Sequence, residues 1–235
     1  APLGVRISAH TGGTLMNMPD ADGLLMADKA FLALRDLLTR GGLRAGQFVS
    51  MPDLVRILEM PMAPVREAVK RAESAALVRI LPKRGVAVME ASPALIRDCF
   101  HLRTILDQEG ARELVRAGVG SRFEGLRTSH RHILDAAREG ITSELQAEAM
   151  QVDWDLHTAL SEALDNDSAR EIYARNRDRI SVMQHSRPLL PDRIIPAMEE
   201  HLLILDALAS GDETLAAAAV RNHYHQTLRW WGIIV

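Results

Sequence analysis

The segment from Ser50 to Met89 constrains the fold most, because two short helical patterns and a hairpin pattern follow one another within it. Ser50 and Asp53 have the three-residue spacing of a helix cap, and the apolar residues after them fall on one face of a helix. A second helix is predicted from about Ala63 to Ala76, after two prolines that interrupt the chain. Its buried stripe is expected to comprise Val65, Val69, Ala72 and Ala76.

Two β-rich runs follow, from Leu77 to Leu81 and from Val86 to Met89. They are joined by Pro82-Lys83-Arg84-Gly85, whose composition predicts a hairpin turn with two cations at its tip. A helix, a second helix and a hairpin in this order are typical of a winged helix-turn-helix. Cations at such a tip suit contact with a phosphate backbone.

The second predicted helix carries its cations outside the apolar stripe. Arg66 and Lys70 are expected to point away from the core, and the first helical turn is expected to expose Met62 and Ala63 beside Arg66. Together with the hairpin tip, these side chains form a predicted DNA-binding surface. Its residues are Met62, Ala63, Arg66, Lys70, Lys83, Arg84 and Gly85.

Charge is divided unevenly along the chain, although the net charge is only -3. Residues 26–90 hold 11 Lys and Arg against 7 Asp and Glu, whereas residues 91–235 hold 16 against 22. Only the first part is therefore expected to bind a polyanion. Surface charge can vary this much by chance, so the charge supports DNA binding only together with the helix and hairpin pattern.

Residues 26–90 resemble the DNA-binding domain of GntR-type bacterial transcription regulators. The similarity lies in Ala63-Pro64-Val65-Arg66-Glu67-Ala68-Val69, followed by Ala76-Leu77-Val78 and Arg84-Gly85-Val86-Ala87-Val88. The chain departs from the family at Pro61-Met62, where Ser-Arg or Thr-Arg is usual, and at Pro52-Asp53-Leu54, where Arg-Glu-Leu is usual. Two arginines that usually contact DNA are therefore absent. The resemblance implies that the retained Arg66 is the main DNA contact.

Length and composition predict a globular intracellular protein of one or two domains. The chain has 235 residues, of which 47% are hydrophobic, and it has no apolar run of the roughly 18 residues that a membrane helix needs. The one cysteine, Cys99, excludes an internal disulfide and fits the reducing cytoplasm. Residues 1–25 show no periodicity and no signal-peptide pattern, so we expect a flexible tail. No membrane partner is expected.

From residue 93 onward the β signals disappear, and helical periodicity with Gly and Pro punctuation predicts an antiparallel bundle of six helices. The chain is thus predicted to be mainly α, with a winged helix-turn-helix over residues 26–90 and an all-helical domain over residues 94–232. The six predicted helices run approximately over Pro93–Ala117, Ser121–Arg138, Thr142–Ala163, Asp167–His185, Pro191–Ser210 and Thr214–Trp230.

Within the predicted bundle, Asp153 and His157 stand four residues apart on one helix face, a spacing that lets two side chains share a metal ion. His201 and His223 fall in the last two helices. Spacing alone does not bring these residues together, and a single histidine is more often a core or surface residue. His225 lies about 200° around the helix from His223, so we expect it to face elsewhere.

Residues 94–232 resemble the effector domain of the FadR branch of the GntR family. The similarity lies in Asp153-Trp154-Asp155-Leu156-His157, in the nine residues from Glu200 to Leu208, and in Ala219-Val220-Arg221-Asn222-His223. Many members of that branch bind a divalent metal through one Asp and three His. The resemblance therefore implies zinc, with nickel or manganese as alternatives, and its ligands would be Asp153, His157, His201 and His223. It further implies effector contacts from Arg103 and Asn166.

The favoured function is a ligand-responsive transcription regulator, a repressor that binds a palindromic operator in double-stranded DNA as a homodimer. Three neutral imidazoles and one carboxylate would leave positive charge on a divalent ion, so a small organic acid could bridge the metal and Arg103. The alternative is a metal-dependent hydrolase or lyase that uses the same Asp and three His. The predicted wing favours the regulator over an enzyme. A third reading is a DNA-binding metalloprotein without a small-molecule effector.

Overall fold

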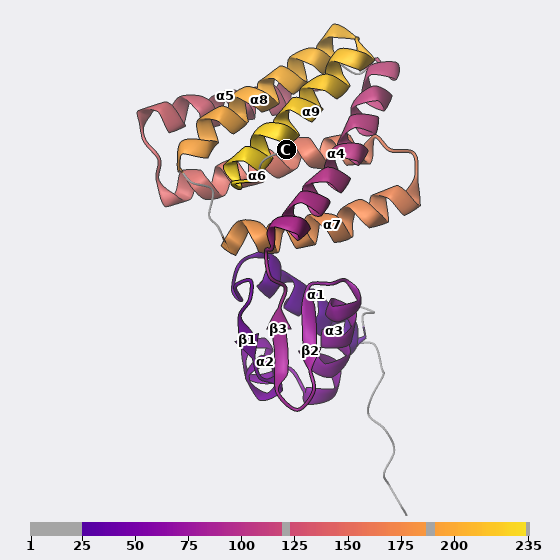
Figure 1. The fold of residues 1–235 in the computed structure, drawn as a ribbon, viewed down its shortest axis with the longest axis vertical. Helices are drawn as coiled ribbons and strands as arrows, with labels where there is room; N and C mark the ends of the chain where they lie inside the picture. The colour runs from indigo at the N-terminus through magenta and orange to yellow at the C-terminus, as the bar shows by residue number, and fades with distance from the viewer. Residues whose placement is uncertain (1–24, 119–122, 187–190, 234–235) are drawn as a thin grey trace, which may run out of the picture.

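The computed structural model describes residues 25–118, 123–186 and 191–233. Figure 1 shows a small winged part at the bottom of the view and a helical bundle above it. The predicted flexible tail over residues 1–25 lies outside the described residues except for Leu25, which precedes the first helix. None of the described helices is long and apolar enough to cross a membrane.

The winged part consists of three helices and a three-stranded antiparallel sheet with the strand order β1-β3-β2. Strands β2 and β3 form the predicted hairpin. Strand β1 was not predicted, because two residues are too few to show a period. The elements are α1 (Met26–Thr39), β1 (Phe48–Val49), α2 (Met51–Leu58), α3 (Met62–Ser74), β2 (Val78–Leu81) and β3 (Gly85–Val88).

Local hydrogen bonds define the ends of α2 and α3. At the start of α2, the Ser50 hydroxyl accepts the Asp53 N–H at 3.2 Å and donates to the Asp53 carboxylate at 2.6 Å, as the sequence predicts. Helix α3 ends at Ser74, two residues before the predicted end. Ala76 is exposed with φ 57°, and the N–H of Leu77 reaches back to the carbonyl of Ala72 at 2.9 Å. This Schellman ending removes Ala76 from the predicted buried stripe and buries Leu77 instead.

Six helices form the bundle in the described part of the chain, in agreement with the prediction. The first residues of the second predicted helix, 121 and 122, lie outside the described residues. The helices are α4 (Pro93–Arg116), α5 (Glu124–Glu139), α6 (Ser143–Glu162), α7 (Asp167–Ser186), α8 (Pro191–Ser210) and α9 (Glu213–Trp230).

Helices α4 and α6 cross at very short range at Gly110. A Cβ atom at this position would lie 1.9 Å from the carbonyl oxygen of Leu160, so only glycine permits the crossing. Three residues before this point on each helix, Asp107 and His157 face one another, and their side chains are hydrogen bonded. The close crossing therefore determines the distance between two buried polar side chains.

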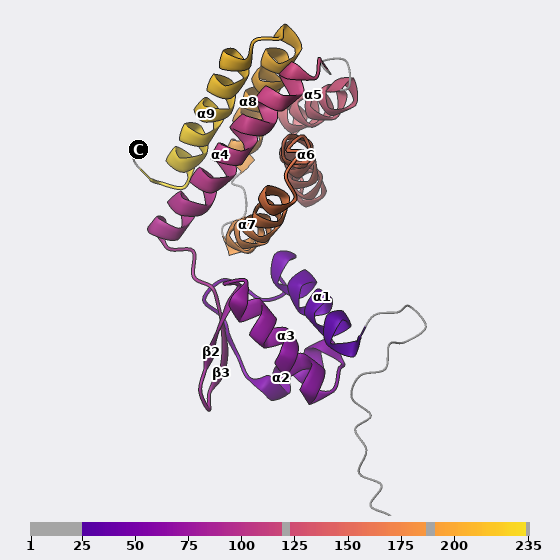
Figure 2. The ribbon, with the colours of Figure 1, turned by 90° about the vertical axis from the view of Figure 1, so that its right-hand side faces the viewer.

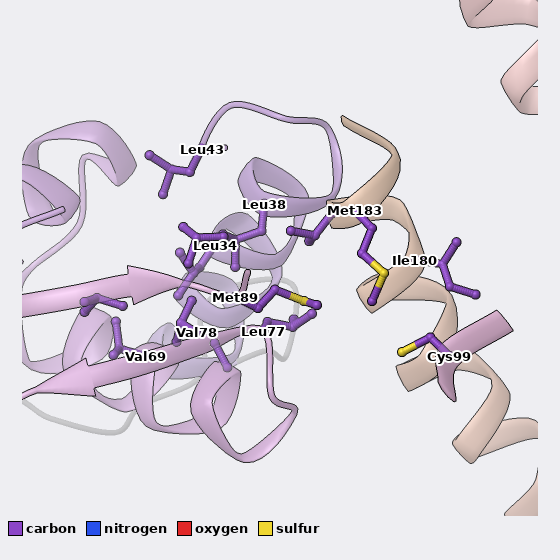
Figure 3. Close-up of a cluster of buried hydrophobic side chains, with 14 of the residues drawn as sticks. Leu34, Leu38, Leu43, Val69, Leu77, Val78, Met89, Cys99, Ile180 and Met183 are labelled. Atoms are coloured by element: carbon purple, nitrogen blue, oxygen red, sulfur yellow. The ribbon is translucent and has the colours of Figure 1, made fainter. Parts of the chain in front are cut away.

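Helix α7 carries the contact between the bundle and the winged part. Figure 2 shows its end beside α1, and Figure 3 shows Met183 of α7 next to Leu38 and Met89 of the winged part, with Ile180 nearer to Cys99 of α4. These side chains belong to one continuous cluster of buried apolar residues. The two parts thus share a core rather than meeting only at polar surfaces.

A charged pair reinforces this contact. The guanidinium of Arg35 on α1 donates to both carboxylate oxygens of Asp178 on α7, at 2.6 and 2.8 Å. Nearby, the ring of His185 lies so close to Gly41 that a Cβ atom there would come within 2.8 Å of it, and Gly41 has φ 75°. Helix α7 is therefore fixed to the winged part by apolar, ionic and close backbone contacts.

Candidate functional site

The four predicted metal ligands lie together inside the bundle. Asp153 and His157 come from α6, His201 from α8 and His223 from α9, and each offers one ligand atom within 4.8 Å of the others. All four are buried. We refer to these four residues as the Asp/His cluster. The spacing along the sequence could relate only Asp153 to His157, and the fold brings the other two beside them.

Two histidines of the cluster are oriented by carboxylates. The Nδ1–H of His157 donates to Asp107 on α4 at 2.8 Å, and the Nδ1–H of His223 donates to Glu200 on α8 at 2.7 Å. Because Nδ1 is occupied in this way, the Nε2 lone pair of each ring points into the cluster. This arrangement of a carboxylate behind an inward-facing imidazole is common at metal sites.

Inside the cluster, the nitrogens of the three histidines and the carboxylate of Asp153 approach one another closely. Nε2 of His201 lies 3.4 Å from Nε2 of His223 and 3.5 Å from the carboxylate of Asp153. Nε2 of His157 lies 4.0 Å from the same carboxylate. Two nitrogens bound to one ion at about 2.1 Å and a tetrahedral angle would be separated by about 3.4 Å. The spacing of the donor atoms thus fits a single small cation.

Two unsatisfied buried atoms support the same conclusion. His157 Nε2 and Asp153 Oδ2 have no hydrogen-bond partner among the described residues. Leaving a buried polar atom without a partner costs about 1–3 kcal/mol, more when the atom is charged. A divalent cation between these atoms would satisfy both. The group of one carboxylate and three imidazoles can therefore hold a metal ion, and the chemistry of the donors fits it.

Burial keeps the histidines of the cluster neutral. It holds the pKa of His157 and His201 well below the usual value, and nearby cationic groups act in the same direction. Burial also lowers the pKa of His223, although the bond to Glu200 opposes the shift. Neutral imidazole is the form that binds metal ions. The fold thus prepares the ligand nitrogens without requiring proton release at neutral pH.

Arg103, predicted to contact an effector, lies at the edge of the cluster. It is buried on α4, with Nη2 3.5 Å from Nε2 of His223 and Nε 3.7 Å from the carboxylate of Asp107. The rings of Phe100 and Trp154 lie 4.9 and 5.9 Å from the guanidinium carbon. Its Nε–H has no hydrogen-bond partner among the described residues. Arg103 therefore brings an unsatisfied cationic donor to the cluster.

Asn166, the other residue expected to contact an effector, is not brought to the cluster. It is exposed at the start of α7, where its side-chain oxygen accepts the backbone N–H of Ala169 at 3.0 Å. The residue is a helix cap, for which Asn is among the favoured types. We therefore do not retain it in the site.

The structure also identifies supporting residues that the sequence analysis did not assign. Asp107 and Glu200 hold His157 and His223, and Glu200 itself accepts two hydrogen bonds from Arg193, each of 2.6 Å. Burial raises the pKa of Asp107 to about 7, although the positive charge of Arg103 opposes the shift. The sequence held only weak indications of these two supporting roles: Asp107 stands one turn after Arg103, and Glu200 directly precedes His201.

A different kind of site lies on the winged part. A groove of about 490 Å³ runs between α3, the start of α2 and the β2–β3 turn. Five of the seven predicted DNA-binding residues line it, namely Arg66, Lys70, Lys83, Arg84 and Gly85. Met62 and Ala63 lie at the start of α3, outside this lining, where Met62 is exposed and Ala63 half-buried. The four cations thus converge from a helix and a hairpin, and we refer to this feature as the basic groove.

The cations of the basic groove are solvated. Lys70 pairs with Glu67 at 2.7 Å, and both side chains are more than half exposed. Arg66 has neither an ion pair nor a hydrogen bond with another described residue. Lys83 adopts φ 62° at the hairpin tip. At Gly85 a Cβ atom would lie 2.5 Å from the carbonyl oxygen of Val49, so this glycine permits the turn to pack against β1.

The fold and the two sites define a protein with a helix-turn-helix and wing joined to a helical bundle that holds the Asp/His cluster. Residues 98–226 match the FCD domain family. The chain belongs to this family, whose domain is the C-terminal effector domain of GntR-type regulators. The resemblance noted for the second half of the sequence is thereby confirmed.

Individual proteins agree with this assignment. The chain is 32% identical over 85 residues to an HTH-type transcriptional regulator in the TAR-I ttuE-ttuC' intergenic region of Agrobacterium vitis, and these residues span 36% of this chain and 50% of that protein. The chain thus spans about half the length of this relative. Two solved structures share the fold, each with a TM-score of 0.71.

The first of these structures is E. coli McbR/YncC, with 18% identity, 88% of this chain covered and 97% of that chain. The second, from Rhodococcus sp. RHA1, is described as a transcriptional regulator GntR and has 22% identity, with 89% of this chain and 99% of that chain covered. At these identities the similarity establishes the fold. The winged helix-turn-helix and the helical bundle thus occur together in other proteins.

Proposed function

We propose that the protein is a transcription regulator, a repressor that binds an operator in double-stranded DNA as a homodimer and responds to a small organic acid. The observation that carries this proposal is the Asp/His cluster with Arg103 beside it, in a bundle that shares its core with a winged part bearing the basic groove. A buried cationic site suits a small anion, and an exposed cationic groove suits a large one.

Asp153, His157, His201 and His223 would hold one divalent ion, zinc in the first instance, with nickel or manganese as alternatives. The ion would supply positive charge and open coordination positions for an oxygen ligand. The role of the protein is to orient the three imidazoles, to keep them neutral and to exclude water. The burial and the hydrogen bonds at Nδ1 support each of these roles.

Arg103 would bind the effector. Its guanidinium is held between the cluster and two aromatic rings, and it retains an N–H without a partner among the described residues. Guanidinium and carboxylate match in shape and charge, so a mono- or dicarboxylate, such as a hydroxy acid or sugar acid, is the expected class of effector. The carboxylate would offset the positive charge that a divalent ion and Arg103 place together in a buried site.

The winged part would bind DNA through α3. With this helix in the major groove, Arg66 and Lys70 would face base edges and phosphates, and Lys83 and Arg84 would reach the phosphate backbone beside it. Met62 and Ala63 would contact DNA from the first turn of the helix. Two copies related by a twofold axis would read an inverted repeat, which is why a palindromic operator is expected.

Helix α7 offers a physical connection between the two sites. The Tyr173 hydroxyl donates to the backbone carbonyl of His157 at 2.8 Å, and five residues later Asp178 binds Arg35 of α1. One rigid helix therefore contacts both a residue of the cluster and the winged part. An effector that shifts α6 could alter the position of the winged part through α7, which is the linkage that a ligand-responsive repressor requires.

A combined measurement tests the proposal. Native mass spectrometry of the purified protein should show about one divalent ion per chain, and a thermal-shift screen of organic acids should find compounds that stabilise the metal-loaded form. A compound found in this way should change operator affinity in a gel-shift titration. Turnover of the acid without any DNA binding would support the hydrolase or lyase instead. DNA binding that no acid alters would support a metalloprotein without an effector.

A further inference from the structure

His130 on α5 is a buried histidine that has no place in the proposed effector chemistry. It is fully buried, and it lies between a backbone carbonyl and the cluster. Its Nδ1 is 2.7 Å from the carbonyl oxygen of Leu126, and its Nε2 is 3.1 Å from Nδ1 of His201. The rings of His130 and His201 meet edge to face, with centroids 5.1 Å apart. A chain of two hydrogen bonds thus links the α5 backbone to one ligand of the cluster.

The donor and acceptor of each of these two hydrogen bonds follow from the backbone carbonyl of Leu126. A carbonyl oxygen can only accept, so Nδ1 of His130 must carry the hydrogen. A His201 ring that presents the lone pair of Nε2 to a metal ion must carry its hydrogen on Nδ1, which lies 3.1 Å from Nε2 of His130. Nε2 of His130 must then accept, and Nδ1 of His201 must donate. The remaining lone pair of His201 lies on Nε2, which faces Asp153 and His223.

We infer that His130 is a positioning residue that fixes His201 in the tautomer and ring orientation required for metal binding. The inference rests on the proposed metal site and adds a function for a residue outside it. His157 and His223 are oriented by carboxylates, which add negative charge next to the ligand. His130 would orient His201 in the same way without adding charge. Outer-shell partners of this kind typically contribute 10–100-fold to metal affinity.

Two substitutions separate hydrogen bonding from packing. His130→Gln keeps an oxygen acceptor at about the reach of Nε2, whereas His130→Leu keeps an apolar side chain of similar size without an acceptor. The control is His132→Leu on the same helix. His132 is well exposed, and its nearest charged partner is Glu148 at 3.9 Å. Circular dichroism of all three variants establishes whether each one folds.

The first readout needs no metal. Long-range proton–nitrogen NMR spectra of the metal-free protein report which ring nitrogen of each histidine carries hydrogen. In the wild type we expect hydrogen on Nδ1 of both His130 and His201. In His130→Leu we expect hydrogen on Nε2 in a substantial fraction of His201 rings, and in His130→Gln we expect the wild-type pattern.

The second readout is zinc affinity from competition with a chelator. His130→Leu should bind zinc about 10–100-fold more weakly than the wild type, while His130→Gln and His132→Leu should remain within about 3-fold. A wild type without zinc affinity would contradict the proposed function, and the metal-free spectra would still test His130. Hydrogen on Nε2 of His130 in the wild type would overturn the inference even if His130→Leu does not fold. Unchanged affinity and an unchanged His201 tautomer in a folded His130→Leu would also overturn it.

Discussion

The Asp/His cluster collects ionisable side chains from three helices, and the basic groove collects them from a helix and a hairpin, yet the two sites are built in opposite ways. In the cluster every imidazole is buried and each Nδ1 has a defined partner, so the inward atoms have one orientation. In the groove the cations are exposed, and Arg66 has no partner among the described residues. Burial makes the cluster depend on each supporting contact, whereas solvation makes each groove cation nearly independent of the others.

The largest effect is expected from removing a ligand of the cluster. His201→Ala should abolish stoichiometric metal binding, since three donors would remain beside an unfilled cavity. Chelation of the wild type should lower its Tm, because a ligand at 1,000 times its Kd stabilises the native state by about 4 kcal/mol. Metal content by native mass spectrometry and thermal melts would test both points.

His225→Ala is the matched control, since His225 is half-buried and its ring lies 5.4 Å from that of Tyr224. This variant should keep its metal. Equal metal loss from the two histidine variants would contradict the four-residue assignment.

A large loss of stability is expected from Gly110→Ala, which affects the bundle and spares the groove. The new methyl would lie 1.9 Å from the carbonyl oxygen of Leu160, so α4 and α6 must move apart. Overpacking of this kind costs about 1–3 kcal/mol, and a clash with backbone belongs at the upper end. Urea unfolding would measure the change.

Gly125 provides the comparison, because nothing lies within 4 Å of a Cβ atom there. Gly125→Ala should be neutral or stabilising, by up to about 1 kcal/mol. A Gly110→Ala protein as stable as the wild type would show that the crossing adjusts freely.

Arg103→Ala should separate effector binding from metal binding. It removes a cationic donor and no metal ligand, so metal content should stay near one ion per chain. Hydrogen bonds to charged groups contribute about 1.5–3 kcal/mol, which corresponds to an effector affinity about 10–150-fold lower. Isothermal titration with an acid identified on the wild type gives the ratio. If the acid binds both proteins equally well, Arg103 is not its carboxylate contact.

Arg66→Ala should weaken operator binding by about 1–3 kcal/mol per half-site while the protein stays folded. Arg71→Ala on the same helix is the control, because the Arg71 guanidinium is already paired with Asp28 at 2.6 Å and lies 4.3 Å from the Phe31 ring centroid. Gel-shift titrations at two salt concentrations would compare them. Full operator affinity of Arg66→Ala would remove this residue from the DNA interface.

The smallest effect on stability is expected from Arg35→Ala, at the junction between the two regions. Its ion pair with Asp178 is partly exposed, so its loss should cost no more than about 1 kcal/mol. The pair joins α7 to α1, and its removal should therefore reduce the effect of the acid on operator affinity more than it reduces either binding step alone. Unchanged coupling in this variant would mean that α7 transmits no signal through this pair.

Local signals in the sequence were sufficient for most of the winged part. The Ser50 cap and the hairpin depend on residues close together in the chain, and both were predicted correctly. Strand β1 exists only because β3 pairs with it, through Phe48 opposite Ala87. The predicted end of α3 is two residues too late, because the chain leaves the helix after Ser74 to bury Leu77 in the core. Helical periodicity does not show where such burial ends a helix.

In the bundle, by contrast, local sequence signals predicted the helices but not the site. Its six helices follow from periodicity, but spacing could relate only Asp153 to His157, and resemblance to a family was needed to add His201 and His223. His130 stands 71 residues before His201, and no pattern connects the two. Residues that orient other residues across a bundle carry little or no local signal in the sequence, so the fold is needed to identify them.

The contact at Gly110 bears on which ions the cluster accepts. Because α4 and α6 cannot slide or separate there, the position of His157 relative to Asp107 is rigid, and Asp153 follows on the same helix. His201 and His223 come from α8 and α9, which lie outside that crossing, and α8 contains a proline in its interior. The proposed metal site would thus have one edge set by the α4–α6 crossing and a second edge on α8 and α9. Because only the first edge is held by a backbone contact at Gly110, the selectivity for ions of different radius should depend on the contacts that hold His201 and His223.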